Sequence, residues 1–410
     1  MQKTVLMNYA KLLARAGLNV QKGQEVIISA ELDQPEFVSL VAEECYRAGA
    51  AKVRVEWAHQ PLDKISAEYR SEEVLGEVLP WQEEKLREET KTLPARLHLE
   101  SSDPDGMSGI DEEKYSRARQ ARLKITKPYR DEMENNYQWC IAAVAGRNWA
   151  KKVFPKANAA AAEEKLWEAI LKCSRAYEGN PLANWQAHNE ELAARCAYLN
   201  NLGLVSLEYK SSNGTDLKVG LMEQGLFMGG GETTLAGVYF NPNIPSEECF
   251  TTPMRGQAEG IVYSAKPLSY QGKLIRNFSI RFEGGRAVEA HAASGEAALK
   301  KMIAMDEGAA YLGECALVPY DSPISRSKTL FYNTLFDENA SCHFALGRGF
   351  TNCVKGYENY SDEQLKAMGV NDSMIHVDFM IGTDDLNITG ITGSGERVPI
   401  FREGNWAFKA

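Results

Sequence analysis

The chain has 410 residues, of which 44% are hydrophobic and 25% are charged, as is typical of a globular protein that dissolves in water. The net charge of −10 argues against a nucleic-acid partner, because such partners usually need a clustered basic surface. No uncharged apolar run is long enough to cross a bilayer, and the N-terminus lacks the apolar core of a signal peptide, so we expect a cytoplasmic protein with no membrane partner.

The first 200 residues alternate between short β-branched runs and segments whose apolar positions recur at helical spacing. This alternation is typical of a mostly parallel sheet with helices on both faces. The predicted strands cover residues 25–30, 52–57, 97–99 and 139–146, and the predicted helices cover residues 1–18, 35–49, 71–91, 111–124, 158–177 and 181–202.

Beyond about residue 204 the pattern changes to strands joined by short turns. Gln271-Gly272-Lys273 and Gly284-Gly285 predict hairpin turns, and one helix is expected over residues 294–305. A chain of this length predicts more than one domain. We therefore expect a doubly wound α/β domain over residues 1–208, followed by a strand-rich α+β domain over residues 209–410, with the boundary near the loop that begins at Ser211.

The clearest chemical pattern is His376-Val377-Asp378, in a segment that alternates polar and apolar residues as a strand does. Residues two apart on a strand share a face, so the imidazole and the carboxylate are expected to point the same way. That arrangement suits two ligands of one metal or of adjacent metals. A hydrogen-bonded His–Asp pair without a metal fits the spacing equally well.

Further carboxylates and imidazoles lie in apolar surroundings. Glu314 stands in an apolar run, where its charge needs a compensating metal or a buried arginine. Glu248 precedes a similar run, although Glu247 is an equally good carboxylate by composition. Glu338 lies in a segment that resembles a helix start, where it could simply complement the helix dipole, and His343 follows within two turns.

Several common site motifs are missing from the sequence. There is no GxGxxG after a strand, no GxxxxGK[ST] and no GxSxG, so neither a dinucleotide site, a P-loop nor a nucleophilic serine is supported. The HExxH helix of many zinc peptidases is also absent. None of the eight cysteines forms a CxxC pair, and we expect free thiols.

Taken together, the motifs resemble the M29 metallo-aminopeptidases, the group of aminopeptidase T, AmpS and PepS, and most closely its PepS-like members. The resemblance runs over essentially the whole chain and keeps the order and spacing of its motifs. The most specific segments are Glu248 with Phe250-Thr251-Thr252-Pro253, Leu312-Gly313-Glu314, residues 331–340 with His343, and His376-Val377-Asp378.

The resemblance implies a hydrolase that removes the N-terminal residue of peptides by means of a water activated by two divalent metal ions. The implied metals are zinc, cobalt or manganese, and the implied assembly is a homodimer. The general base is expected to be Glu314 or Glu338. The implied metal ligands are Glu248, Glu314, His343, His376 and Asp378, with Glu338 as a further ligand or near neighbour.

One position departs from the family pattern. Family members usually carry tyrosine seven residues after the histidine that corresponds to His343, where this chain has Phe350. The ring is kept but the hydroxyl donor is lost, and one such donor can contribute roughly 10²–10³ in rate. The alternative function is therefore a catalytically impaired family member that binds peptides or metal, unless a group such as Arg348 supplies the missing donor.

Overall fold

The computed structural model describes residues 1–409, which form two compact units. Unit 1 comprises Met1–Trp185 and Gly231–Ile244, and unit 2 comprises Gln186–Gly230 and Pro245–Ala410. The chain thus passes from unit 1 to unit 2 within one helix, and it returns once to unit 1 for a short segment. The division into domains at residues 208 and 209 stays a prediction.

Unit 1 is built on a parallel sheet. Within the described residues the sheet has five strands in the order β2-β1-β3-β4-β9, and every neighbouring pair is parallel. Its strands are β1 (Glu25–Glu31), β2 (Lys52–Ala58), β3 (Ala95–Glu100), β4 (Trp139–Ala143) and β9 (Asn243–Ile244). A separate hairpin pairs β7 (Glu232–Thr233) with β8 (Tyr239–Phe240).

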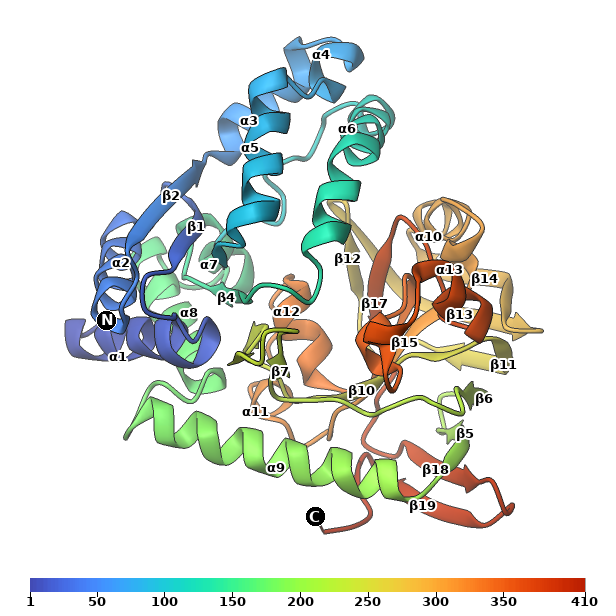
Figure 1. The fold of residues 1–410 in the computed structure, drawn as a ribbon. Helices are drawn as coiled ribbons and strands as arrows, with labels where there is room; N and C mark the ends of the chain where they lie inside the picture. Colours follow the sequence, from blue (N-terminus) through green and yellow to red (C-terminus); the bar gives the residue numbers. More distant parts are fainter. Residues whose placement is uncertain (410) are drawn as a thin grey trace. The chain divides into compact units, whose positions relative to one another are not determined.

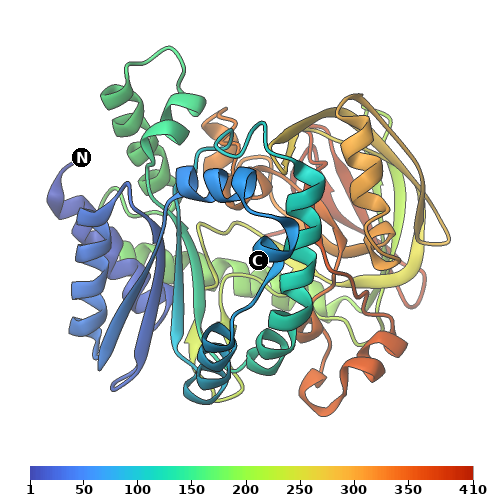
Figure 2. The same ribbon diagram turned by 90° about the horizontal axis from the view of Figure 1, so that it is seen from above.

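Helices connect and cover these strands, as Figures 1 and 2 show. Helix α2 begins with Pro35 in its first turn, ends at a glycine and contacts β1 and β2, and its buried residues include Phe37, Val38 and Val41. The helices of unit 1 are α1 (Lys3–Leu12), α2 (Pro35–Ala48), α3 (Gln60–Tyr69), α4 (Glu72–Gly76), α5 (Pro80–Thr92), α6 (Glu112–Met133), α7 (Arg147–Val153) and α8 (Ala159–Cys173). Helix α9 (Pro181–Asn201) begins in unit 1 and continues in unit 2.

The sequence prediction of unit 1 is confirmed in outline and incomplete in detail. All four predicted strands are present, but α3 and α7 were not predicted. The helix expected over residues 71–91 is two helices, because Pro80 begins a new one at the start of α5. The first helix ends at Leu12 and passes into a wider π-helical turn over Leu13–Gly17.

Unit 2 contains two antiparallel sheets. The larger has nine strands within the described residues, in the order β12-β13-β11-β6-β5-β18-β19-β20 with β14 paired to β13, and the smaller has four, in the order β10-β15-β16-β17. The large sheet consists of β5 (Leu204–Lys210), β6 (Asp216–Leu221), β11 (Pro253–Tyr263), β12 (Leu268–Tyr270), β13 (Lys273–Glu283), β14 (Arg286–Ser294), β18 (Asn387–Thr392), β19 (Arg397–Arg402) and β20 (Asn405–Trp406). The small sheet consists of β10 (Cys249–Thr251), β15 (Leu312–Leu317), β16 (His343–Gly347) and β17 (His376–Met380).

Short helices complete unit 2. The two predicted hairpin turns are confirmed, since Gln271-Gly272 joins β12 to β13 and Gly284-Gly285 joins β13 to β14. The loop at Ser211 joins β5 to β6 within one sheet. The helices are α10 (Glu296–Ile303), α11 (Pro323–Arg326), α12 (Thr334–Asp337) and α13 (Asp362–Met368).

The core of unit 2 joins one face of the small sheet to the large sheet. It includes Phe344 and Phe379 from the small sheet, and Tyr209, Phe278 and Phe282 from the large one. The Phe344 ring packs edge-on against the ring of Tyr209, with their centroids 4.9 Å apart. The small sheet is therefore anchored through one face, which leaves its other face for polar groups.

Among the described residues, no helix combines the length and the apolar character that a membrane span needs.

The predicted architecture, a parallel α/β region followed by an antiparallel strand-rich region, is confirmed.

The anchoring of the small sheet can be tested by truncating its central aromatic residue. Phe344→Ala should lower the free energy of unfolding by about 3–5 kcal/mol, because it empties a fully buried site. Urea denaturation followed by tryptophan fluorescence measures the loss. The control Val288→Ala, at a side chain 46% exposed, should cost less than about 1 kcal/mol. Equal losses in the two variants would contradict the packing described.

Candidate metal centre

The register of the small sheet places the predicted ligands on one face. In antiparallel strands, residues directly opposite each other share a face. Glu314 on β15 lies opposite Ala345 on β16, and Ala345 lies opposite Asp378 on β17. Two further pairs on the same face are Ala316 with His343, and Gly347 with His376.

Small residues separate the ligand-bearing positions on this face. Ala316, Ala345 and Gly347 stand between or beside the acidic and imidazole side chains, and none of them extends beyond a methyl group. The neighbouring residues in sequence point the other way. Cys315, Phe344 and Phe379 are opposite one another in the register and belong to the core. The sheet is therefore apolar behind, and all the ligand-bearing positions of its strands face the front.

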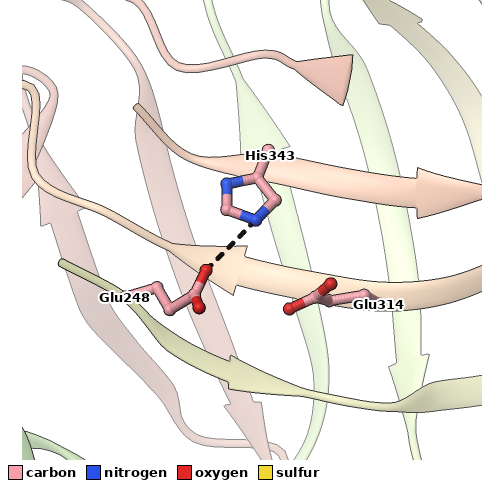
Figure 3. A group of neighbouring side chains, drawn as sticks. All are labelled: Glu248, Glu314 and His343. Carbon is pink, nitrogen blue, oxygen red and sulfur yellow. Dashed lines mark ion pairs between the residues drawn. The ribbon is translucent and has the colours of Figure 1, made fainter. Parts of the chain in front are cut away.

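Two groups of side chains on this face converge closely enough to hold a cation. The first consists of Glu248, Glu314 and His343, and the second of Glu314, His376 and Asp378. In each group one potential ligand atom per residue lies within 4.8 Å of the others. Figure 3 shows the first group, in which the imidazole and the two carboxylates turn toward a common space. Glu314 belongs to both groups, so the two potential sites adjoin.

The distances within the groups are short. His343 Nε2 lies 3.3 Å from Glu248 Oε2, the ion pair drawn in Figure 3, and His376 Nε2 lies 3.0 Å from Glu314 Oε2. The side chains of Glu248, Glu314, His343 and Asp378 are each less than 10% exposed. The His376 side chain is 26% exposed, so the centre is most open beside this residue.

Backbone carbonyls orient both imidazoles. His343 Nδ1 donates to the Ser341 carbonyl oxygen at 3.2 Å, and His376 Nδ1 donates to the Arg348 carbonyl oxygen at 2.7 Å. A carbonyl only accepts, so the proton is assigned to Nδ1 in each ring. With Nδ1 held in this way, each Nε2 faces the carboxylates. It donates to them while the ring is protonated, and once that proton is lost its lone pair is available to a metal, as in metal-ligating histidines.

Glu314 is positioned by a bulge in its strand. The pairing of β15 with β16 shifts register between Leu312 and Glu314, and the residue in between is Gly313. A Cβ atom at Gly313 would lie 2.3 Å from the carbonyl oxygens of both Gly347 and Arg348. Only glycine allows this close approach, which aligns Glu314 with Asp378 across the sheet.

The buried charges shift one another's pKa values. Burial raises the pKa of Glu314 to about 7, and the negative charges of Asp378 and Glu248 add to the effect. Burial opposes protonation of His343, but the hydrogen bond and charge of Glu248 outweigh it and raise the pKa to about 9. Burial also opposes the charged form of Asp378, yet the positive charge of His376 lowers its pKa to about 2.

These residues fit a pair of divalent cations. Asp378 Oδ1 is buried and makes no hydrogen bond, although His376 Nε2 lies 3.3 Å away as an ion partner. A buried carboxylate oxygen without a hydrogen bond is rare in folded proteins. Three carboxylates and two imidazoles are the donor types that zinc, cobalt and manganese accept.

The other predicted site residues lie nearby or outside these groups. Glu338 is buried but belongs to neither group, and Asn339 Nδ2 donates to its Oε1 at 3.4 Å. Its role as a ligand or base stays a prediction. The Phe350 ring contacts the His376 ring, with centroids 4.9 Å apart. Glu247, the alternative to Glu248, approaches His188 Nε2 at 3.8 Å and belongs to neither group.

Two local predictions were wrong. The segment at Glu338 was interpreted as a helix start, but α12 ends at Asp337 and a single 3-10 turn follows. His343 was expected on a helix, but it is the first residue of β16, where pairing on both sides fixes its direction. Its neighbours Phe344 and Leu346 alternate with Ala345 as strand residues do, and this pattern was available in the sequence.

Supporting residues from distant parts of the chain were not predicted. His188 on α9 donates from Nε2 to the Ser246 carbonyl oxygen at 2.7 Å, and the amide of Glu247 donates to Asn339 Oδ1 at 2.6 Å. Ser246 Oγ donates to Glu248 Oε1 at 3.4 Å. These contacts fix the segment that carries Glu248. The contacts of His188 and Asn339 join residues that are 58 and 92 positions apart in the chain, so no local pattern could have indicated them.

Comparison with known proteins decides the family. The model of the thermophilic metalloprotease (M29) family matches residues 2–406. The chain belongs to the M29 family. It is 42% identical to aminopeptidase AmpS of Bacillus subtilis and 40% identical to aminopeptidase PepS of Streptococcus thermophilus, in each case over 98% of both chains. The solved structure of wild-type AmpT from Thermus thermophilus superposes with a TM-score of 0.91 at 39% identity, covering 99% of this chain and 100% of that one.

The predicted family and enzyme class, an M29 metallo-aminopeptidase, are thus confirmed. The identities to AmpS and PepS differ by too little to choose between branches, so the closer likeness to PepS stays a prediction.

Metal binding by this M29 protein should depend on pH. With no metal bound, His343 titrates near pH 9 and Glu314 near pH 7, so a cation at neutral pH must displace their protons. The apparent affinity for zinc should therefore rise as the pH increases from 6 to 8.5, with release of protons on binding. Chelator competition measures the affinity, and calorimetry in two buffers of different ionisation enthalpy measures the protons. A pH-independent affinity without proton release would contradict the assignment.

Proposed function

We propose that this metallo-aminopeptidase releases the N-terminal residue of peptides at the centre formed by Glu248, Glu314, His343, His376 and Asp378. The observation that carries the proposal is the convergence of two three-residue groups that share Glu314. Such an arrangement suits two adjacent divalent ions, which when bound can polarise a peptide carbonyl and lower the pKa of water.

The chain's own residues would divide the work as follows. The two imidazoles, fixed by backbone carbonyls, and the carboxylates of Glu248, Glu314 and Asp378 hold the ions. Glu314 lies between the two groups, where its carboxylate is near any water placed there. We propose Glu314, with Glu338 as the alternative, as the group that accepts a proton during peptide hydrolysis.

Further features are proposed from the family resemblance. The ions are zinc, cobalt or manganese, two in each subunit, because mixed carboxylate and imidazole ligands accept all three. The protein acts as a homodimer in the cytoplasm. Elemental analysis of the purified protein measures the identity and number of the ions, and sedimentation of the metal-loaded chain measures whether it is a dimer.

Glu314→Gln tests the shared ligand. The substitution keeps the size of the side chain but removes its charge, so it should reduce bound metal to less than one ion per chain and abolish cleavage of leucyl p-nitroanilide. Glu289→Gln on the exposed strand β14 is the control and should keep both metal and activity, because that side chain is 58% exposed and forms a surface ion pair with Arg281. A Glu314→Gln protein that cleaves the anilide at the wild-type rate would exclude this centre.

Phe350 motivates the alternative function, a family member impaired in catalysis. Its ring contacts His376, so a hydroxyl added to this ring would be introduced beside the centre. Phe350→Tyr should raise kcat about tenfold or more with little change in KM, because a new donor would stabilise charge that develops only in the transition state. Steady-state kinetics on leucyl p-nitroanilide measure the effect.

The same kinetics separate the two functions. Activity of the wild-type protein with zinc, cobalt or manganese supports the hydrolase. No activity in the wild type with any of the three, together with activity in Phe350→Tyr, would support the impaired family member. An unchanged or lower kcat in Phe350→Tyr would show that another group already supplies the donor.

A further inference from the structure

Two phenylalanines form an apolar surface beside the metal centre. Phe250 on β10 lies opposite Ala316 in the register, and Ala316 lies opposite His343, so the Phe250 side chain is on the same face of the small sheet as the ligands. Glu248, two residues before it, shares this face. The Phe250 ring meets the Phe350 ring edge-on, with their centroids 5.3 Å apart.

Phe350 is held in place from both sides. Its backbone N–H donates to Thr252 Oγ1 at 2.7 Å, and the same hydroxyl donates to the Phe350 carbonyl oxygen at 3.1 Å. Its ring lies against the His376 ring. The row Phe250, Phe350 and His376 is therefore a continuous aromatic surface that ends at a ligand of the centre.

This surface lies where the centre is open. His376 is the most exposed of the five grouped ligands, and both phenylalanines are half-buried, whereas Phe344 and Phe379 on the other face are fully covered. Neither of these partly buried aromatic residues belongs to the hydrophobic core of unit 2, although both lie next to the buried carboxylates.

We propose that Phe250 and Phe350 form the contact surface for the side chain of the substrate's N-terminal residue and make the enzyme favour large apolar residues over small ones. The inference rests on the proposed function. In an aminopeptidase the carbonyl attacked belongs to the N-terminal residue, so its side chain must lie within a few ångströms of the centre. The aromatic surface is an apolar feature that the structure offers beside His376, the most exposed ligand of the centre.

The magnitude of the expected selectivity follows from burial. Each methylene group transferred from water to an apolar pocket favours binding, and one methylene can change kcat/KM by roughly 10–200-fold. Leucine has three more carbon atoms than alanine, so its N-terminal peptides should gain most from the surface. Removal of one ring should cost leucine substrates much more than alanine substrates.

The test compares leucyl and alanyl p-nitroanilides on the metal-loaded full chain. In Phe250→Ala the leucine-to-alanine ratio of kcat/KM should fall about tenfold or more, whereas Phe250→Leu, which restores apolar volume, should keep the ratio within about threefold of the wild type. Phe408→Ala is the matched control, since Phe408 is also half-buried but packs against Tyr198 and Trp406. Its ratio should not change.

Two further measurements make the outcome decisive. Elemental analysis should find the same metal content in Phe250→Ala as in the wild type, and calorimetry should show that the variant loses more affinity for free L-leucine than for L-alanine. An unchanged ratio with unchanged relative affinities, or a fall that accompanies loss of metal, would overturn the proposal. If the wild type cleaves neither anilide, the proposed function fails, and the leucine and alanine affinities still decide whether the surface recognises apolar side chains.

Discussion

The structure of the centre depends on the burial of like charges on one face of a four-stranded antiparallel sheet. Glu248, Glu314 and Asp378 are each less than 10% exposed, and only two imidazoles accompany them within the two groups. Isolated carboxylates are costly to remove from water. Without metal, burial raises the pKa of Glu314 to about 7, and the hydrogen bond and charge of Glu248 raise the pKa of His343 to about 9. Divalent cations would balance the same charges without those protons.

The two faces of the small sheet serve opposite needs. The core face carries Cys315, Phe344 and Phe379, which anchor the sheet against the large sheet and thereby hold the strands rigid. The opposite face carries ligands separated by alanine and glycine, so no large side chain stands between the ligands within a row of the register. The packing behind the sheet thus fixes the positions of the ligand side chains. The bulge at Gly313 shifts the register so that Glu314 lies in line with Asp378.

The pairing register also links the proposed metal ligands to the proposed substrate contact surface. The same row that contains His343 leads through Ala316 to Phe250, so a ligand and an apolar contact surface are fixed by one set of backbone hydrogen bonds. Phenylalanine at position 350, where the resemblance implies tyrosine in the family, makes this surface more apolar. It therefore affects two properties at once, the supply of a hydrogen-bond donor and the character of the surface next to His376.

The sequence by itself determined the alternation of strands and helices in the first half, the change to hairpins in the second, and the pairing of His376 with Asp378 on one strand face. These features follow from local periodicity and turn residues, which act over a few positions. The M29 motifs also identified Glu248, Glu314 and His343, but by resemblance and not by any local rule. Only the tertiary structure decided that His343 lies on a strand, that Glu314 is common to two groups while Glu338 is in neither, and that His188 and Asn339 support the segment of Glu248. The physical reason is that strand register and side-chain convergence depend on pairings between residues tens of positions apart, which no local pattern encodes.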